Sequence, residues 1–171
     1  MTRIPFALAL LAAGSACVST QDAPHDPAQR KPLLDALKSL EGTWEQKDEK
    51  GEAMLCEFKV TAAGSAVREI MFPGTAQEMT NLYSLDGNGL ALVHYCAMGN
   101  QPRMRATARE GKNMAFGMVS VSDMESPEEP YMGEMTLEFV DQDHIVEHWR
   151  TYVKDVLQKD EGVDIALTRR K

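Results

Sequence analysis

From residue 43 to the C-terminus, short runs with apolar residues at alternate positions follow one another, separated by turn-forming residues. Alternation with a period of two is typical of strands that bury one face. The expected strands, about ten, are 43–48, 53–61, 66–72, 78–86, 90–97, 103–109, 114–121, 133–140, 144–153 and 163–169. Tight turns, such as the one predicted at Asp86–Gly89, connect most of them and indicate an antiparallel meander.

An open sheet of this size would expose two long edges, and closure into a barrel removes them. A β-sandwich is the alternative, but it needs more long crossover connections than this chain offers. The predicted fold class is therefore all-β, an antiparallel up-and-down closed barrel of about ten strands with a short N-terminal helix. Residues 126–130 are expected to form a mobile loop, and residues 154–162 either a bent hairpin or one helical turn.

The helix is expected from Pro32 to Leu40. Proline suits the first helical turn, and the leucines at 33, 34, 37 and 40 share one face. Gly42 then ends the helical pattern. Residues 32–171 together make the predicted barrel domain.

The first residues have the order of a secretory signal peptide, predicted at 1–16. Arg3 precedes an apolar run, and small residues follow it. The run is too short to be a membrane-spanning helix. The polar, proline-rich residues 17–31 are expected to form a disordered tether.

Cys17 follows the small residues directly and resembles the acylated cysteine of bacterial lipoproteins. Gly14 stands where such signals favour leucine, so cleavage without lipid attachment remains the alternative. The predicted location is outside the cytoplasm: a periplasmic, membrane-anchored lipoprotein, or otherwise a soluble periplasmic or secreted protein.

The chain carries 18 basic and 26 acidic residues, a net charge of −8. Nucleic acids and anionic membranes require a basic face, so neither is an expected partner. The only membrane contact expected is the lipid on Cys17.

The stretch LEGTWE (40–45), entered from a short leucine helix, resembles the opening of calycin-like barrels such as lipocalins, fatty-acid-binding proteins and nitrobindin-like proteins. Residues 64–75, 78–90, 94–104 and 144–149 resemble a bacterial secreted family of unknown function. The resemblance implies a carrier-like barrel without established chemistry. Nitrobindin-like proteins hold haem through a histidine in the last strand, which residues 163–169 lack, so no cofactor is expected.

Alternate residues of a strand, and directly paired residues of neighbouring strands, share a face. A two- or four-residue turn at 86–89 would place His94 and Cys96 inward beside Tyr83. A three-residue turn at 141–143 would place Glu147 and Trp149 inward and leave His144 and His148 outside. The residues expected in the lumen or at its rim are Glu69, Met79, Tyr83, Leu92, His94, Cys96, Asn100, Gln101, Arg103, Phe116, Glu147 and Trp149.

The roles of the polar residues remain open at this point. An inward Glu147 is costly unless paired, and Arg68, Arg103, Arg105 or a protonated His94 could pair with it. Such a glutamate would be a structural ion-pair partner, a polar anchor for a ligand, or an acid/base group acting with His94. The methionine-rich wall is either an adaptable ligand surface or core filler. Residues 98–102 are expected to form a loop at one mouth of the barrel.

His94 and Cys96 have the right atom types for a metal, but they provide too few ligands, so no metal is expected. Cys56 and Cys96 could form a disulfide in an oxidising compartment. In a simple meander, however, two strands separate them, which favours free thiols.

The predicted function is binding of a small hydrophobic or amphipathic molecule, because apolar walls with a few convergent polar groups are the usual design of such sites. Two alternatives remain. One is an isomerase or hydrolase that uses Glu147 and His94, and the other is a packed structural barrel of the cell envelope.

Overall fold

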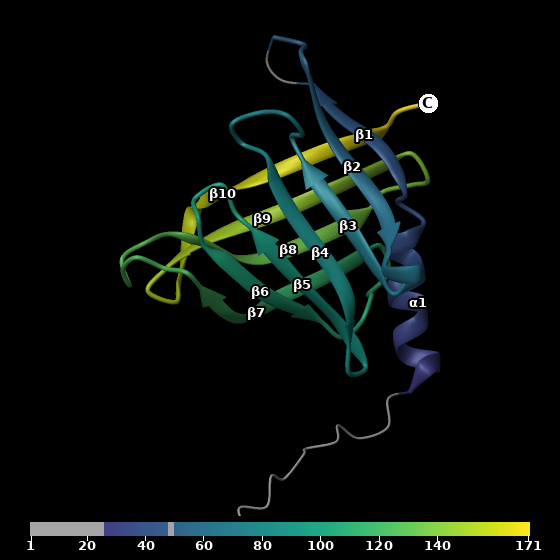
Figure 1. Ribbon diagram of the computed structural model, residues 1–171, viewed down its shortest axis with the longest axis horizontal. Helices are drawn as coiled ribbons and strands as arrows, with labels where there is room; N and C mark the ends of the chain where they lie inside the picture. The colour runs from purple at the N-terminus through teal and green to yellow at the C-terminus, as the bar shows by residue number, and fades with distance from the viewer. Residues whose placement is uncertain (1–25, 48–49) are drawn as a thin grey trace, which may run out of the picture.

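The computed structural model describes residues 26–47 and 50–171 and forms a closed antiparallel barrel of ten strands with one α-helix (Figure 1). The predicted fold class is confirmed. In chain order the elements are α1 (Pro27–Lys38), β1 (Gly42–Lys47), β2 (Ala53–Thr61), the short 3₁₀ helix η1 (Ala62–Gly64), β3 (Ala66–Met71), β4 (Met79–Asp86), β5 (Gly89–Tyr95), β6 (Gln101–Ala106), β7 (Asn113–Ser122), β8 (Tyr131–Phe139), β9 (His144–Val153) and β10 (Val156–Arg169). Each strand pairs with its neighbours in the chain, and β1 pairs with β10 to close the ring.

The closing seam is held by side chains as well as by backbone pairing. Trp44 of β1 lies opposite Arg169 of β10, and the guanidinium group lies 4.2 Å from the centre of the indole ring. The same guanidinium donates to the carbonyl oxygens of Ser39 and Glu41, at 2.8 and 2.9 Å. Arg169 therefore ties the last strand to the segment that joins α1 to β1, a contact between the two ends of the described chain.

Helix α1 packs at the end of the barrel where the turns β2–β3 and β4–β5 lie (Figure 1). It starts at Pro27, earlier than the expected Pro32, because the Asp26 side chain accepts a hydrogen bond from the backbone N–H of Ala28 and caps it. Its buried leucines belong to the same apolar core as the barrel interior. The helix therefore plugs this end, while the opposite end has no such cover among the described residues.

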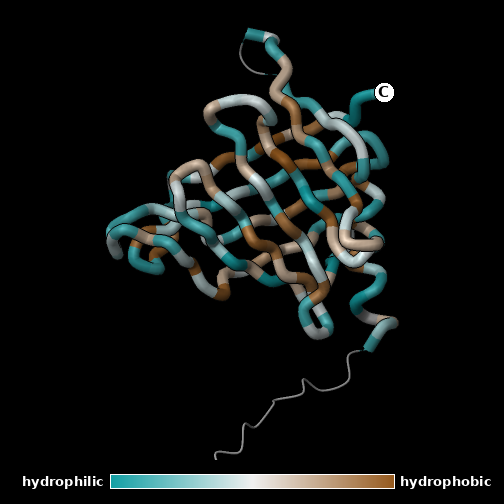
Figure 2. Tube along the Cα trace, viewed as in Figure 1, coloured by the Kyte–Doolittle hydropathy of each residue, from teal (hydrophilic) through white to brown (hydrophobic). Residues whose placement is uncertain are grey.

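The register agrees with the predicted inward and outward faces. The turn after β4 has two residues, since Asp86 pairs with Gly89, and β8 pairs with β9 through Phe139 and Ile145. Apolar and polar residues alternate along most strands in Figure 2, as expected for a barrel with an apolar interior. His144 and His148 lie on the outer face, in contact with the carboxyl groups of Asp141 and Asp164.

The structure decides one alternative that the sequence left open and corrects one strand boundary. Residues 154–162 form a bent hairpin and not a helical turn, because Lys154 and Asp155 make a tight turn with positive φ and a bulge follows between Leu157 and Gly162. Strand β6 starts at Gln101 and not at residue 103. No described helix has both the length and the apolar character needed to cross a membrane.

Candidate functional site

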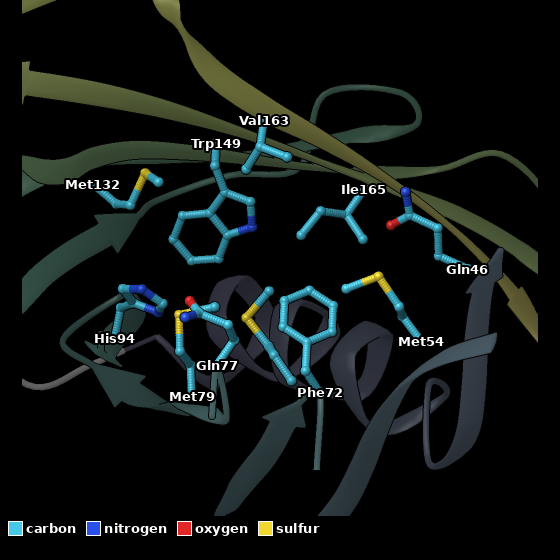
Figure 3. A pocket seen from close by; sticks show the side chains of 11 residues that line it. Gln46, Met54, Phe72, Gln77, Met79, His94, Met132, Trp149, Val163 and Ile165 are labelled. Atoms are coloured by element: carbon cyan, nitrogen blue, oxygen red, sulfur yellow. The ribbon is translucent and has the colours of Figure 1, made fainter. Parts of the chain in front are cut away.

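A cavity of about 410 Å³ lies inside the barrel at the end opposite α1. This volume falls within the range of small-molecule sites, about 300–1,000 Å³. Figure 3 shows the side chains that surround it. They are Gln46, Met54, Met71, Phe72, Gln77, Met79, His94, Met132, Trp149, Val163 and Ile165. Three of them, Met79, His94 and Trp149, belong to the site expected from the sequence.

Five other expected residues point into the barrel but lie beneath the cavity rather than on its surface. They are Glu69, Tyr83, Leu92, Phe116 and Glu147, and each is at most 1% exposed. Their inward orientation is as predicted. A molecule in the cavity would meet the residues above them.

The expected loop contacts at the rim need correction. Arg103 points outward and pairs with Asp86 at 3.2 Å, because β6 starts at Gln101 and its inward positions are Pro102 and Met104. Neither Arg103 nor its neighbour Arg105, which also contacts Asp86, reaches Glu147. The expected ion pair between Glu147 and one of these arginines is therefore absent.

Asn100, Gln101 and Cys96 build the turn after β5 and do not line the cavity. Asn100 is buried, and its amide donates to Glu129 at 2.7 Å and to the carbonyl oxygen of Pro130 at 3.0 Å. Gln101 donates to the carbonyl oxygen of Gly99, and the backbone N–H of Cys96 donates to that of Asn100. These residues hold two loops together.

A hydrogen-bonded network of polar side chains lies directly under the cavity. Oε2 of Glu69 accepts from the Asn81 amide at 2.8 Å and from the Tyr83 hydroxyl at 2.9 Å. Across the lumen, Oε2 of Glu147 accepts from the indole N–H of Trp149 at 2.9 Å. Each carboxyl group keeps its Oε1 atom enclosed and without another donor.

The two carboxyl groups lie close enough for each to shift the pKa of the other. Burial raises the pKa of both, and the nearby charge of Glu69 raises the pKa of Glu147 further. Since Glu69 already accepts from Asn81 and Tyr83, it is the better carboxylate, and we expect Glu147 to be the protonated member of the pair. A proton on Glu147 then takes the place of the arginine that the sequence suggested.

His94 joins this network to the cavity wall. Its Nδ1 atom lies 2.7 Å from Oδ1 of Asn81, and its ring centre lies 4.7 Å from that of Trp149. Burial lowers the pKa of His94 to about 4, so the imidazole is neutral at physiological pH. The order Glu69, Asn81, His94 is a continuous chain of hydrogen bonds that ends at the cavity.

This arrangement bears on the other chemistry considered from the sequence. Glu147 is fully enclosed and does not line the cavity, so it does not form an acid/base pair with His94 around a bound molecule. Within the described residues, no cluster of three or more His, Cys, Asp or Glu side chains is arranged to hold a metal ion. Cys56 and Cys96 are free thiols, and Cys17 lies outside the described residues.

Several lining residues were not expected from the sequence. Met132 falls one position before the predicted start of its strand, and an irregularity between Met132 and Glu134 brings it to the inner face. Phe72 was expected to be the last residue of the strand 66–72, but β3 ends at Met71, so Phe72 and Gln77 both come from the connection between β3 and β4. Phe72 adopts a positive φ, a conformation that the residue type does not suggest.

The structure thus defines a ten-stranded antiparallel β-barrel, consistent with a calycin-like fold, that is plugged at one end and hollow at the other. Comparison with protein-family models found no match, and comparison with curated proteins found none either.

Proposed function

We propose that the protein binds one small, mainly apolar molecule in the end cavity. The observation that carries the proposal is the cavity itself, about 410 Å³ inside a barrel whose other end is plugged by α1. A barrel that served only as a packed structural unit would fill this space with side chains.

The composition of the wall supports an apolar ligand. Four methionines, two aromatic rings and two aliphatic side chains provide most of the surface, and the described lining residues include no Lys, Arg, Asp or Glu. Thioether side chains are flexible and polarisable, so such a wall adapts to ligands of irregular shape. Gln46 and Gln77 add polar amides to it.

The test is titration with N-phenyl-1-naphthylamine, an uncharged apolar dye whose fluorescence rises in an apolar site. Val163 lines the cavity and is 42% exposed, so Val163→Trp places bulk at the mouth without disturbing the deep core. Val156→Trp is the matched control, because Val156 lies on the same strand, is 61% exposed and does not line the cavity.

Saturable binding by the wild type and by Val156→Trp is expected, with affinity reduced at least about tenfold in Val163→Trp. Equal affinity in the two variants, or no saturable binding by the wild type, would contradict the proposal. If the expected binding is found, native mass spectrometry of protein purified gently from its host is the measurement that identifies the natural ligand.

Export and lipid attachment through Cys17 form a separate part of the proposal, supported by the signal-like residues 1–16. The expected result in a bacterial host is incorporation of labelled palmitate, lost in Cys17→Ala. If the wild type is secreted without incorporating palmitate, the export proposal is supported and the lipid-anchor proposal is contradicted.

A further inference from the structure

The orientation of the Asn81 side chain decides which nitrogen of His94 carries the proton. Asn81 donates through Nδ2 to Glu69, so its Oδ1 atom is the one that faces His94. An amide oxygen only accepts, and Nδ1 of His94 must therefore be the protonated nitrogen. The other ring nitrogen, Nε2, is left with a free lone pair.

Nε2 has no hydrogen-bond partner among the described residues. Nε2 is not fully enclosed. Among the described residues, the side-chain atoms that are both fully enclosed and without a partner are Oε1 of Glu69, Oε1 of Glu147 and Oδ1 of Asn100. His94 lines the cavity, as Figure 3 shows, and is only 2% exposed. The cavity therefore contains a buried hydrogen-bond acceptor that the protein itself leaves unused.

The surroundings of His94 disfavour a negatively charged ligand. No cationic side chain lies among the described lining residues, so a carboxylate in the cavity would be an unpaired buried charge. Glu69 and Glu147, beneath the cavity, are carboxyl groups and add no positive charge in any protonation state. An anionic headgroup would also present a second acceptor to Nε2.

We infer that the cavity selects molecules that present an uncharged hydrogen-bond donor, a hydroxyl or N–H group, to Nε2 of His94, and that it rejects carboxylates. The inference rests on the proposed binding function. The apolar part of such a molecule packs against Met79, Met132 and Trp149, while the donor end points at the imidazole.

The experiment compares three ligands with the same ten-carbon chain: 1-decanol, decyl methyl ether and decanoate. Each competes with N-phenyl-1-naphthylamine for wild-type protein at pH 7.5. The alcohol should bind about fivefold more tightly than the ether, as one net neutral hydrogen bond predicts. Decanoate should bind at least about a hundredfold more weakly than the alcohol.

His94→Phe keeps a ring beside Trp149 and removes Nε2, so the alcohol should lose its advantage over the ether. His148→Phe is the control on the outer face and should keep that advantage. The comparison in the wild type decides the question even where His94→Phe fails to fold.

The possible failures are distinguishable. If the dye binds and Val163→Trp blocks its binding, but the ether or decanoate binds as tightly as the alcohol, the headgroup inference is overturned and the proposed binding function is retained. The same holds if the dye binds and the alcohol does not compete. If the dye does not bind at all, both fall together.

Discussion

Glu69 of β3 and Glu147 of β9 are both fully buried in the barrel lumen, where each carboxyl group shifts the pKa of the other. Two ionised carboxylates in such a place would repel each other and lose their hydration, so we expect the pair to hold at least one proton when both residues are inside. The pair also sets the orientation of Asn81, and through Asn81 it sets the tautomer of His94.

The first prediction concerns stability against pH. The raised pKa of Glu147 means that the folded chain holds a proton that the unfolded chain releases. This proton stabilises the folded state fully below the ordinary carboxyl pKa, and the stabilisation is lost as pH rises through the raised pKa. His94 acts in the opposite direction between about pH 4 and about 6.5, because its pKa is lowered to about 4. The free energy of unfolding should therefore decline above about pH 6.5.

Glu147→Gln keeps a donor toward Glu69 and an acceptor for Trp149 without a proton to lose. Relative to the wild type, its free energy of unfolding should increase with pH by up to about 1.4 kcal/mol per pH unit, measured by urea unfolding from pH 6 to 9. Glu57→Gln, on the exposed face of β2, should follow the wild type. A Glu147→Gln curve parallel to that of the wild type would show that Glu147 holds no extra proton in the folded protein.

The second prediction concerns His94 directly. Nitrogen-15 NMR of histidine-labelled protein should show the neutral tautomer protonated at Nδ1 from pH 5 to 8, with titration only near pH 4. The signal is assigned by its loss in His94→Phe, and the remaining histidines serve as references in the same sample. Observation of the Nε2-protonated tautomer would contradict the assignment, and the cavity would then lack the free acceptor proposed for His94.

The third prediction concerns the closing seam. Arg169→Lys removes a guanidinium that stacks on Trp44 and donates to three backbone carbonyls, which a single ammonium cannot reproduce. A loss of about 1–2 kcal/mol in the free energy of unfolding is expected. The side chain of Arg170, next in sequence, pairs with Glu45 at 3.5 Å near the surface. Arg170→Lys leaves the backbone hydrogen bond to Thr43 in place and should cost less than about 0.5 kcal/mol. Equal effects would show that the seam depends on charge alone.

The fourth prediction uses two glycines in the sheet. A Cβ atom at Gly89 would overlap the backbone carbonyl oxygen of Ala106 on the neighbouring strand, which cannot move without breaking the sheet. Gly89→Ala should therefore lower the free energy of unfolding by about 2 kcal/mol or more. At Gly117 the same atom meets open space, and Gly117→Ala should change stability by less than about 1 kcal/mol in thermal or urea unfolding. Comparable losses at both positions would argue against the close approach of β5 and β6.

Much of the barrel could be predicted because its information is local. Alternation of apolar and polar residues is a property of each strand, and a two-residue turn at Asp86–Gly89 transfers the inward face from Tyr83 to His94. The same reasoning placed Glu147 and Trp149 inside and His144 and His148 outside. Prediction failed at a strand boundary: residues 98–102 were expected to be a loop, but β6 starts at Gln101, and its pairing with β5 turns Met104 inward and Arg103 outward.

The sequence by itself determined the class of fold and the inward residues, because one-face burial imposes a period of two on every strand and an even spread of short turns favours closure. Only the tertiary structure decided which inward residues meet. Glu69 and Glu147 come from strands far apart in the chain, and no local pattern shows that they lie opposite each other across a lumen. The boundary between filled core and open cavity was also a tertiary outcome, because it depends on how side chains from all sides pack into one volume and on which end the helix covers.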